Sequence, residues 1–210
     1  MLDAKLRPLI DPPLDAAGRW IARRGVGPNT VTLLGLLPGL AAAFAIAHGR
    51  FELGLGLVLL NRLLDGLDGA VARATRQTDF GGYLDIVADF AFYVAVPTGF
   101  GFAAAENAVA AMVLIAAFTL TGVSFLAYAT LAAKRGVETR AHGHKSFFYN
   151  TGLAEGTETI VVFVLMCLRP SQFALFAWVY AGLCLVTVVQ RSALARATFR
   201  SDKTENEVSR

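Results

Sequence analysis

The sequence predicts an all-α integral membrane protein with six transmembrane helices and an N-terminal interfacial amphipathic helix. Of its 210 residues, 55% are hydrophobic and 17% are charged, and the mean hydropathy is +0.54. Soluble domains carry about 25% charged residues, so the composition excludes an ordinary soluble domain. Six apolar runs are each close to the about 20 residues that a helix needs to cross a bilayer; they lie at 31–48, 51–72, 82–104, 107–132, 148–168 and 172–193.

Residues 1–27 are expected to form a cytoplasmic or interfacial segment. Pro8, Pro12 and Pro13 should break any long helix there, and a helix after Pro13 would place Trp20 at the level of the lipid headgroups. The segment is too polar for a secretory signal peptide. The six-helix catalytic domain would then cover residues 28–196, and residues 197–210 would form a polar tail.

The basic residues predict the topology. Sixteen of the 19 Lys and Arg residues fall in the N-terminal segment, in the links after the second and fourth runs, and in the C-terminal stretch from Arg191 onward. Because basic loops stay in the cytoplasm, both termini are expected there. The charges form no basic stripe, so no nucleic-acid partner is expected. Cys167 and Cys184 lie in apolar runs and are expected to be small buried side chains, without a disulfide or a metal.

Four aspartates stand where two apolar runs meet a polar link. Asp65 and Asp68 end the second run, and Asp85 and Asp89 begin the third. In an antiparallel helix pair, the helical rise of about 1.5 Å per residue sets Asp68 level with Asp85, and Asp65 level with Asp89. Carboxylates within a membrane are costly and usually functional. Oxygen ligands suit Mg²⁺ or Mn²⁺, and two such ions would balance four carboxylates and could clamp a reacting phosphate.

Small residues and one arginine accompany the acids. Arg73 stands at the mouth of the expected pocket, where it could meet a phosphate. Four glycines would let a ligand approach the backbone closely: Gly66, Gly69, Gly81 and Gly82. In the alternative interpretation, the glycines only pack helices and the carboxylates are structural.

This stretch resembles the signature of the CDP-alcohol phosphotransferases, integral membrane enzymes of phospholipid synthesis, in the pattern Asp65-x-x-Asp68-Gly69-x-x-Ala72-Arg73, eight residues, Gly82-x-x-x-Asp85-x-x-x-Asp89. The resemblance implies that the four aspartates hold two divalent metals, with Asp85 and Asp89 catalytic and Asp89 also acting as base toward the acceptor hydroxyl. It further implies that the cytidine nucleotide is accommodated by Gly69, Ala72, Arg73 and Gly82.

The implied activity is transfer of a phosphatidyl group from a CDP-linked donor to an alcohol, with release of CMP. The favoured donor is CDP-diacylglycerol; CDP-choline or CDP-ethanolamine would also fit, and the acceptor, a small alcohol or a lipid, is open. We expect a multi-pass protein of the bacterial inner membrane with a cytoplasmic active site, lipid contacts and a possible homodimer. The alternative is a divalent-cation transporter or channel that uses the intramembrane aspartates; a catalytically silent assembly partner is a weaker one.

The start of the first apolar run carries two further candidates. Asn29 and Thr32 belong to a Pro-Asn-x-Val-Thr string that resembles the segment before the first span in the same family, so both are candidates for nucleotide contacts. A plainer interpretation makes Asn29 or Thr30 the helix N-cap. Gly35 and Gly39 predict a close helix crossing.

Two groups of residues are candidates for the acceptor side. Arg62 lies deep in the second run and must find an anion, for which we expect Glu155 or Glu158; either glutamate could instead orient the acceptor alcohol. The basic link after the fourth run would bind phosphates of the acceptor or donor, or simply touch lipid phosphates. Its candidates are Lys134, Arg135, Arg140, His144 and Lys145.

Overall fold

The computed structural model describes residues 2–135 and 156–200, and all regular elements in those ranges are helices. The predicted all-helical class is therefore confirmed. The helices are α1 (Leu2–Arg23), α2 (Pro28–Ala47), α3 (Phe51–Ala74), α4 (Asp79–Ala103), α5 (Ala108–Lys134), α6 (Gly156–Leu168) and α7 (Phe173–Arg200), with 3-10 turns η1 (Ala105–Asn107) and η3 (Pro170–Gln172).

Four helical segments of the described chain are long and apolar enough to cross a membrane: Pro28–Ala47, Asp79–Ala103, Ala105–Lys134 and Pro170–Phe199. Helix α6 is apolar but shorter. Helix α3 has 24 residues, enough to cross a bilayer by length, but its charged residues make it less apolar than the four segments named above. The count of six spans therefore stays a prediction for α3 and α6.

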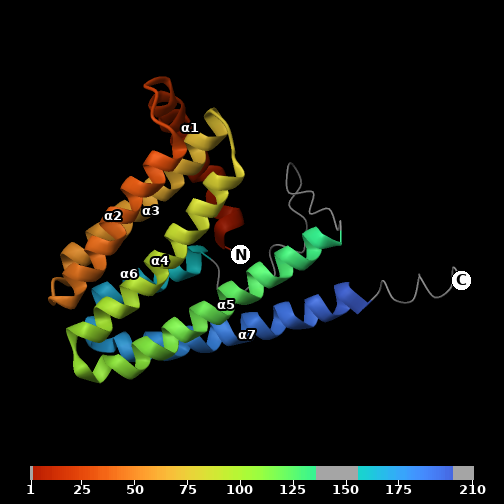
Figure 1. The fold of residues 1–210 in the computed structure, drawn as a ribbon. Helices are drawn as coiled ribbons and strands as arrows, with labels where there is room; N and C mark the ends of the chain where they lie inside the picture. Colours follow the sequence, from red (N-terminus) through yellow and green to blue (C-terminus); the bar gives the residue numbers. More distant parts are fainter. Residues whose placement is uncertain (1, 136–155, 201–210) are drawn as a thin grey trace, which may run out of the picture.

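Helix α2 is the centre of the N-terminal half, because both α3 and α4 pack against it and contact each other far less (Figure 1). The sequence predicted that α3 and α4 would pack as a pair. Two glycines of α2 explain the difference. A Cβ on Gly35 would lie 3.1 Å from Leu64 Cβ, and one on Gly39 would lie 2.9 Å from Asn61 Nδ2. The predicted close crossing is confirmed, and it draws α3 onto α2 instead of onto α4.

Helices α5 and α7 pack side by side along much of their length, and α4 packs on α5 (Figure 1). Aromatic side chains fill the junction. Phe100 of α4 stacks on Phe173 of α7 with ring centroids 4.5 Å apart, and Phe92 meets Phe163 of α6 edge-on at 5.6 Å. This core joins α4 to the C-terminal helices, so α4 has one face in the core and another toward α3.

Outside the core, the helices expose large apolar side chains, among them Phe44 at 68% and Phe102 at 80%. A surface so rich in apolar groups suits lipid and not water. Cys167 and Cys184 are buried free thiols, as the sequence predicted.

Three element boundaries differ from the sequence predictions. Helix α1 continues through all three of its prolines. The half after Pro13 packs closely on α3, since a Cβ on Gly18 would lie 2.7 Å from Ala70. Helix α2 begins at Pro28 with Gly27 as N-cap, since proline suits the first helical position. Asn29 and Thr30 therefore lie in the first turn and neither is the cap. Helix α7 continues to Arg200, past the expected start of the tail at 197.

Candidate active site

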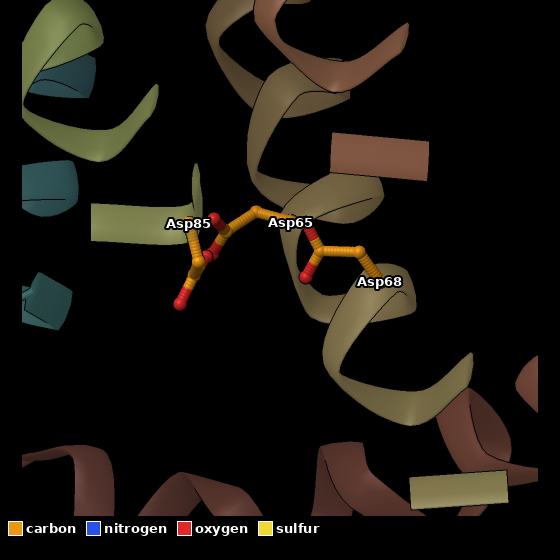
Figure 2. Close-up of side chains that lie close together, drawn as sticks. All are labelled: Asp65, Asp68 and Asp85. Atoms are coloured by element: carbon orange, nitrogen blue, oxygen red, sulfur yellow. The ribbon is translucent and has the colours of Figure 1, made fainter. Parts of the chain in front are cut away.

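Three of the four aspartates converge between α3 and α4 (Figure 2). Asp65 and Asp68 of α3 and Asp85 of α4 each offer a carboxylate oxygen, and these oxygens lie within 4.8 Å of one another. Asp68 is buried, and its Oδ2 has no hydrogen-bond partner among the described residues. Buried polar atoms without a partner are rare in proteins. An unpartnered acidic oxygen facing two other carboxylates fits a hard divalent cation.

Asp89 is not part of this three-acid cluster. Its Oδ1 accepts a hydrogen bond of 2.8 Å from Nη1 of Arg62, and the same nitrogen lies 3.5 Å from Asp65 Oδ2. Arg62 thus pairs with two of the signature aspartates, which the sequence analysis did not predict. Asp65 is three residues after Arg62 and shares its helix face, which brings both side chains toward α4. Of the glutamates expected as its partners, Glu155 lies outside the described residues, and Glu158 stands in the first turn of α6.

A cavity of about 760 Å³ opens beside the acids, and Asp68 and Asp85 are in its wall. All six residues predicted to bind the nucleotide line this cavity: Asn29, Thr32, Gly69, Ala72, Arg73 and Gly82. Because α3 and α4 both pack on α2 and contact each other far less, the residues of the signature surround an open space. The structure adds lining residues from the α3–α4 link that sequence reasoning missed, namely Arg76, Gln77 and Thr78. These three residues are polar and lie directly between the two halves of the signature, and that position could have marked them as part of the site.

The glycines divide into two roles. Gly69 and Gly82 line the cavity, and a Cβ on Gly82 would meet nothing within 4 Å, so this position leaves space for a ligand. Gly66 does not serve the acids as expected, since a Cβ there would lie 2.9 Å from Leu14 of α1. Gly81 also lines the cavity; a Cβ there would lie 3.1 Å from Asn29 Oδ1, and its backbone N donates to Thr78 Oγ1, the cap of α4, at 3.0 Å.

Arg73 reaches back to α1. Its Nη2 and Nε donate to Asp15 Oδ1 at 2.7 and 3.1 Å. Both side chains are partly exposed, at 44% and 35%, so this pair is screened by water and weak. The pair therefore holds the guanidinium only weakly, and Arg73 also lines the cavity.

The two acceptor-side candidates among the described basic residues lie away from the cavity. Lys134 and Arg135 stand at the end of α5, and neither lines the cavity. Arg135 Nη1 donates to the Phe199 carbonyl at 3.0 Å, which ties α5 to α7. Four further candidates lie outside the described residues: Arg140, His144, Lys145 and Glu155.

Comparison with known proteins identifies related membrane proteins. The CDP-alcohol phosphatidyltransferase family matches residues 26–190. The chain is 48% identical over 202 residues to the inner membrane protein YnjF of Escherichia coli K12, covering 96% of this chain and 98% of that one. It is 38% identical over 88 residues to the archaetidylinositol phosphate synthase of Pyrococcus horikoshii, 41% of this chain and 46% of that protein.

Among solved structures, the phosphatidylinositol phosphate synthase of Mycobacterium tuberculosis in complex with manganese and citrate matches with a TM-score of 0.64 at 25% identity, over 87% of this chain and 88% of that one. The overall fold is therefore shared with that solved structure. With its aspartate signature intact and the match running over most of its length, the chain belongs to the CDP-alcohol phosphatidyltransferase family of membrane transferases in phospholipid synthesis.

Proposed function

We propose that this protein transfers a phosphatidyl group from CDP-diacylglycerol to an alcohol and releases CMP. One observation carries the proposal: three carboxylates converge, and two of them, Asp68 and Asp85, line a cavity with all six residues predicted to bind the nucleotide. A cavity of about 760 Å³ is in the range of ligand pockets, about 300 to 1,000 Å³. Because it lies between helix ends, a lipid donor can place its nucleotide there while its acyl chains stay in the bilayer.

The aspartates would hold two divalent cations, Mg²⁺ or Mn²⁺, with Asp65, Asp68 and Asp85 as the core of the ligand set and Asp89 as its fourth member. Bound ions would supply positive charge to the diphosphate of the donor. The manganese in the solved mycobacterial synthase supports this assignment. Asp65 and Asp85 also face each other across the α3–α4 space (Figure 2), so ion binding would fix the distance between these helices.

The chain's own groups would perform the remaining steps. Arg73 would leave Asp15 and bind a donor phosphate, while Gly69 and Gly82 leave room for the nucleotide. Asp89 would take the proton of the acceptor hydroxyl as general base. The acceptor oxygen then forms its bond to the donor phosphorus as the bond from that phosphorus to CMP breaks, and CMP leaves with the bonding electrons.

The topology is part of the proposal. With most basic residues on one side, both termini and the cavity face the cytoplasm of a bacterial inner membrane, where CDP-linked substrates are made. The names of two relatives end in inositol phosphate synthase, so an inositol phosphate is the first acceptor to test. Serine, glycerol 3-phosphate and phosphatidyl lipids follow it.

The experiment is CMP release by the purified protein with Mn²⁺ or Mg²⁺, CDP-diacylglycerol and this panel of acceptors. Release that depends on both the metal and one acceptor supports the proposal. Failure of every acceptor, including those tried with CDP-choline and CDP-ethanolamine, would refute it. Flux of Mn²⁺ into proteoliposomes is the matching test for the transporter alternative.

A further inference from the structure

A second cavity, of about 320 Å³, opens beside the nucleotide cavity, and the proposed reaction gives it no role. It lies where the link between α1 and α2 meets the link between α3 and α4. Its wall on the α1–α2 side is apolar, with Ala22, Val26 and Pro28 among the lining residues. A Cβ on Gly25 or Gly27 of the same link would meet nothing within 4 Å. The cavity can therefore admit an apolar group close to the backbone.

Arg76 is the cation of this second cavity. It lines both cavities, it is exposed, and within the described chain it has no ion pair or hydrogen bond. The neighbouring arginines are engaged. Arg73 donates to Asp15, and the Cζ of Arg24 lies 3.5 Å from the centroid of the Trp20 ring. An uncommitted arginine beside an apolar wall suits a phosphate that also carries apolar groups.

The cavity lies at the end of α1, the helix that the sequence predicts at the membrane surface. Trp20, in the last turn of α1, is 50% exposed, and tryptophan is enriched at the level of lipid headgroups. Helix α2, which starts directly after the link, is long and apolar enough to cross a membrane. The backbone N–H groups of Val26 and Gly27 donate to no backbone carbonyl of the described chain. They are therefore available to a phosphate oxygen at headgroup level.

We propose that the second cavity binds the glycerophosphate headgroup of an anionic membrane phospholipid. Arg76 would hold the phosphate, and the apolar wall would cover the glycerol carbons. A free phosphate ion could use Arg76 but would leave the apolar wall without a partner, so the wall favours the lipid. The proposal goes beyond the transfer reaction, and lipid binding can be tested without it.

A lipid in the second cavity should affect the nucleotide cavity, because the two share the lining residues Pro28, Asn29, Arg76 and Thr78. Arg76 cannot fully neutralise a lipid phosphate and the donor diphosphate at the same time. Anionic lipid should therefore raise the KM for CDP-diacylglycerol, by about threefold for an exposed charge. The comparison uses wild type and Val26→Trp, whose added ring fills the second cavity. An equal rise of KM in both would contradict this coupling.

Binding is measured directly, as the dissociation constant of phosphatidylglycerol by native mass spectrometry of the full chain in neutral detergent micelles that contain a small fraction of this lipid. Val26→Trp should weaken binding by about tenfold or more, because it fills the cavity without changing the charge. Its control is Ile10→Trp, which adds the same side chain at an exposed position of α1 outside both cavities. Ile10→Trp should stay within about twofold of wild type.

Arg76→Gln tests the cation, and it also serves if Val26→Trp does not fold. Loss of one charge-assisted contact should weaken phosphatidylglycerol binding by about fivefold. Arg23→Gln is its control, because Arg23 is an exposed arginine of α1 that lines neither cavity. Micelles with little anionic lipid carry a low surface charge, so Arg23→Gln should change the affinity by no more than about twofold.

Three results would overturn the proposal. The first is equal affinity for phosphatidylglycerol in a variant and its control. The second is binding of phosphatidylcholine as tight as that of phosphatidylglycerol, since the site requires an anionic headgroup. The third is tighter binding of inorganic phosphate than of the lipid, which would assign Arg76 to a free anion. If wild type binds the lipid as expected but releases no CMP with any acceptor, the proposed function fails and this inference stands.

Discussion

Asp68→Asn tests the metal site at its most buried ligand. The side chain is 5% exposed, and the amide keeps its shape while removing its charge. Oxygens of Asp65 and Asp85 lie within 4.8 Å. At that distance and an effective dielectric constant of about 20, each like-charge pair repels by about 3 kcal/mol, before water and counter-ions relieve part of it. Without divalent ions, Asp68→Asn should therefore be more stable than wild type by about 1 to 3 kcal/mol.

Divalent ions should reverse the order. A ligand at 100 times its dissociation constant stabilises wild type by about 2.7 kcal/mol, and Asp68→Asn should lose most of this gain along with CMP release. Thermal unfolding in detergent with EDTA or with Mn²⁺ measures both effects. Glu52→Gln is the control, because it removes an exposed carboxylate from the opposite end of the same helix. An equal rise in Tm with Mn²⁺ in both variants, or Asp68→Asn activity above about a tenth of wild type, would contradict the metal role.

Three further predictions test the cavity and the packing around it. Arg73→Ala should raise the KM for CDP-diacylglycerol by about tenfold or more, whereas Asp15→Asn, which frees Arg73, should not raise it; equal effects in kinetic assays would show that the pair is structural. Gly82→Leu should weaken CMP binding by calorimetry at unchanged Tm, because the space there is open; a large loss of Tm would show that the position is packed. Gly18→Ala should lower the free energy of unfolding by about 1 to 3 kcal/mol, since its Cβ would lie 2.7 Å from Ala70 of α3. Gly56→Ala is the control, because a Cβ there meets nothing within 4 Å. Equal melting temperatures for the two variants would contradict the close crossing of α1 and α3.

The sequence predicted the helical class because apolar run length is a local property, whereas the six predicted residues that line the cavity came from the resemblance to the family. Apolar run length sets the helices, and the spacing of Asp65 and Asp68 places both on one face of α3. It could not predict that Asp89 turns to Arg62, since partner choice among four acids and one arginine depends on how far α3 and α4 are splayed. The glycines of α2 predicted a close crossing, but not that its partner would be α3.

Packing against three other helices explains how a helix as charged as α3 is accommodated in an apolar protein. Helix α1 covers one side of α3 and α2 covers another, and on both sides the contacts are made at glycines. Its charged face is turned toward α4, where Arg62 and Asp89 neutralise each other. Helix α3 thus depends on protein neighbours more than on lipid. Weakening the α1 contact should therefore disturb the acids as well as the fold, because α1 holds the helix that carries two of them.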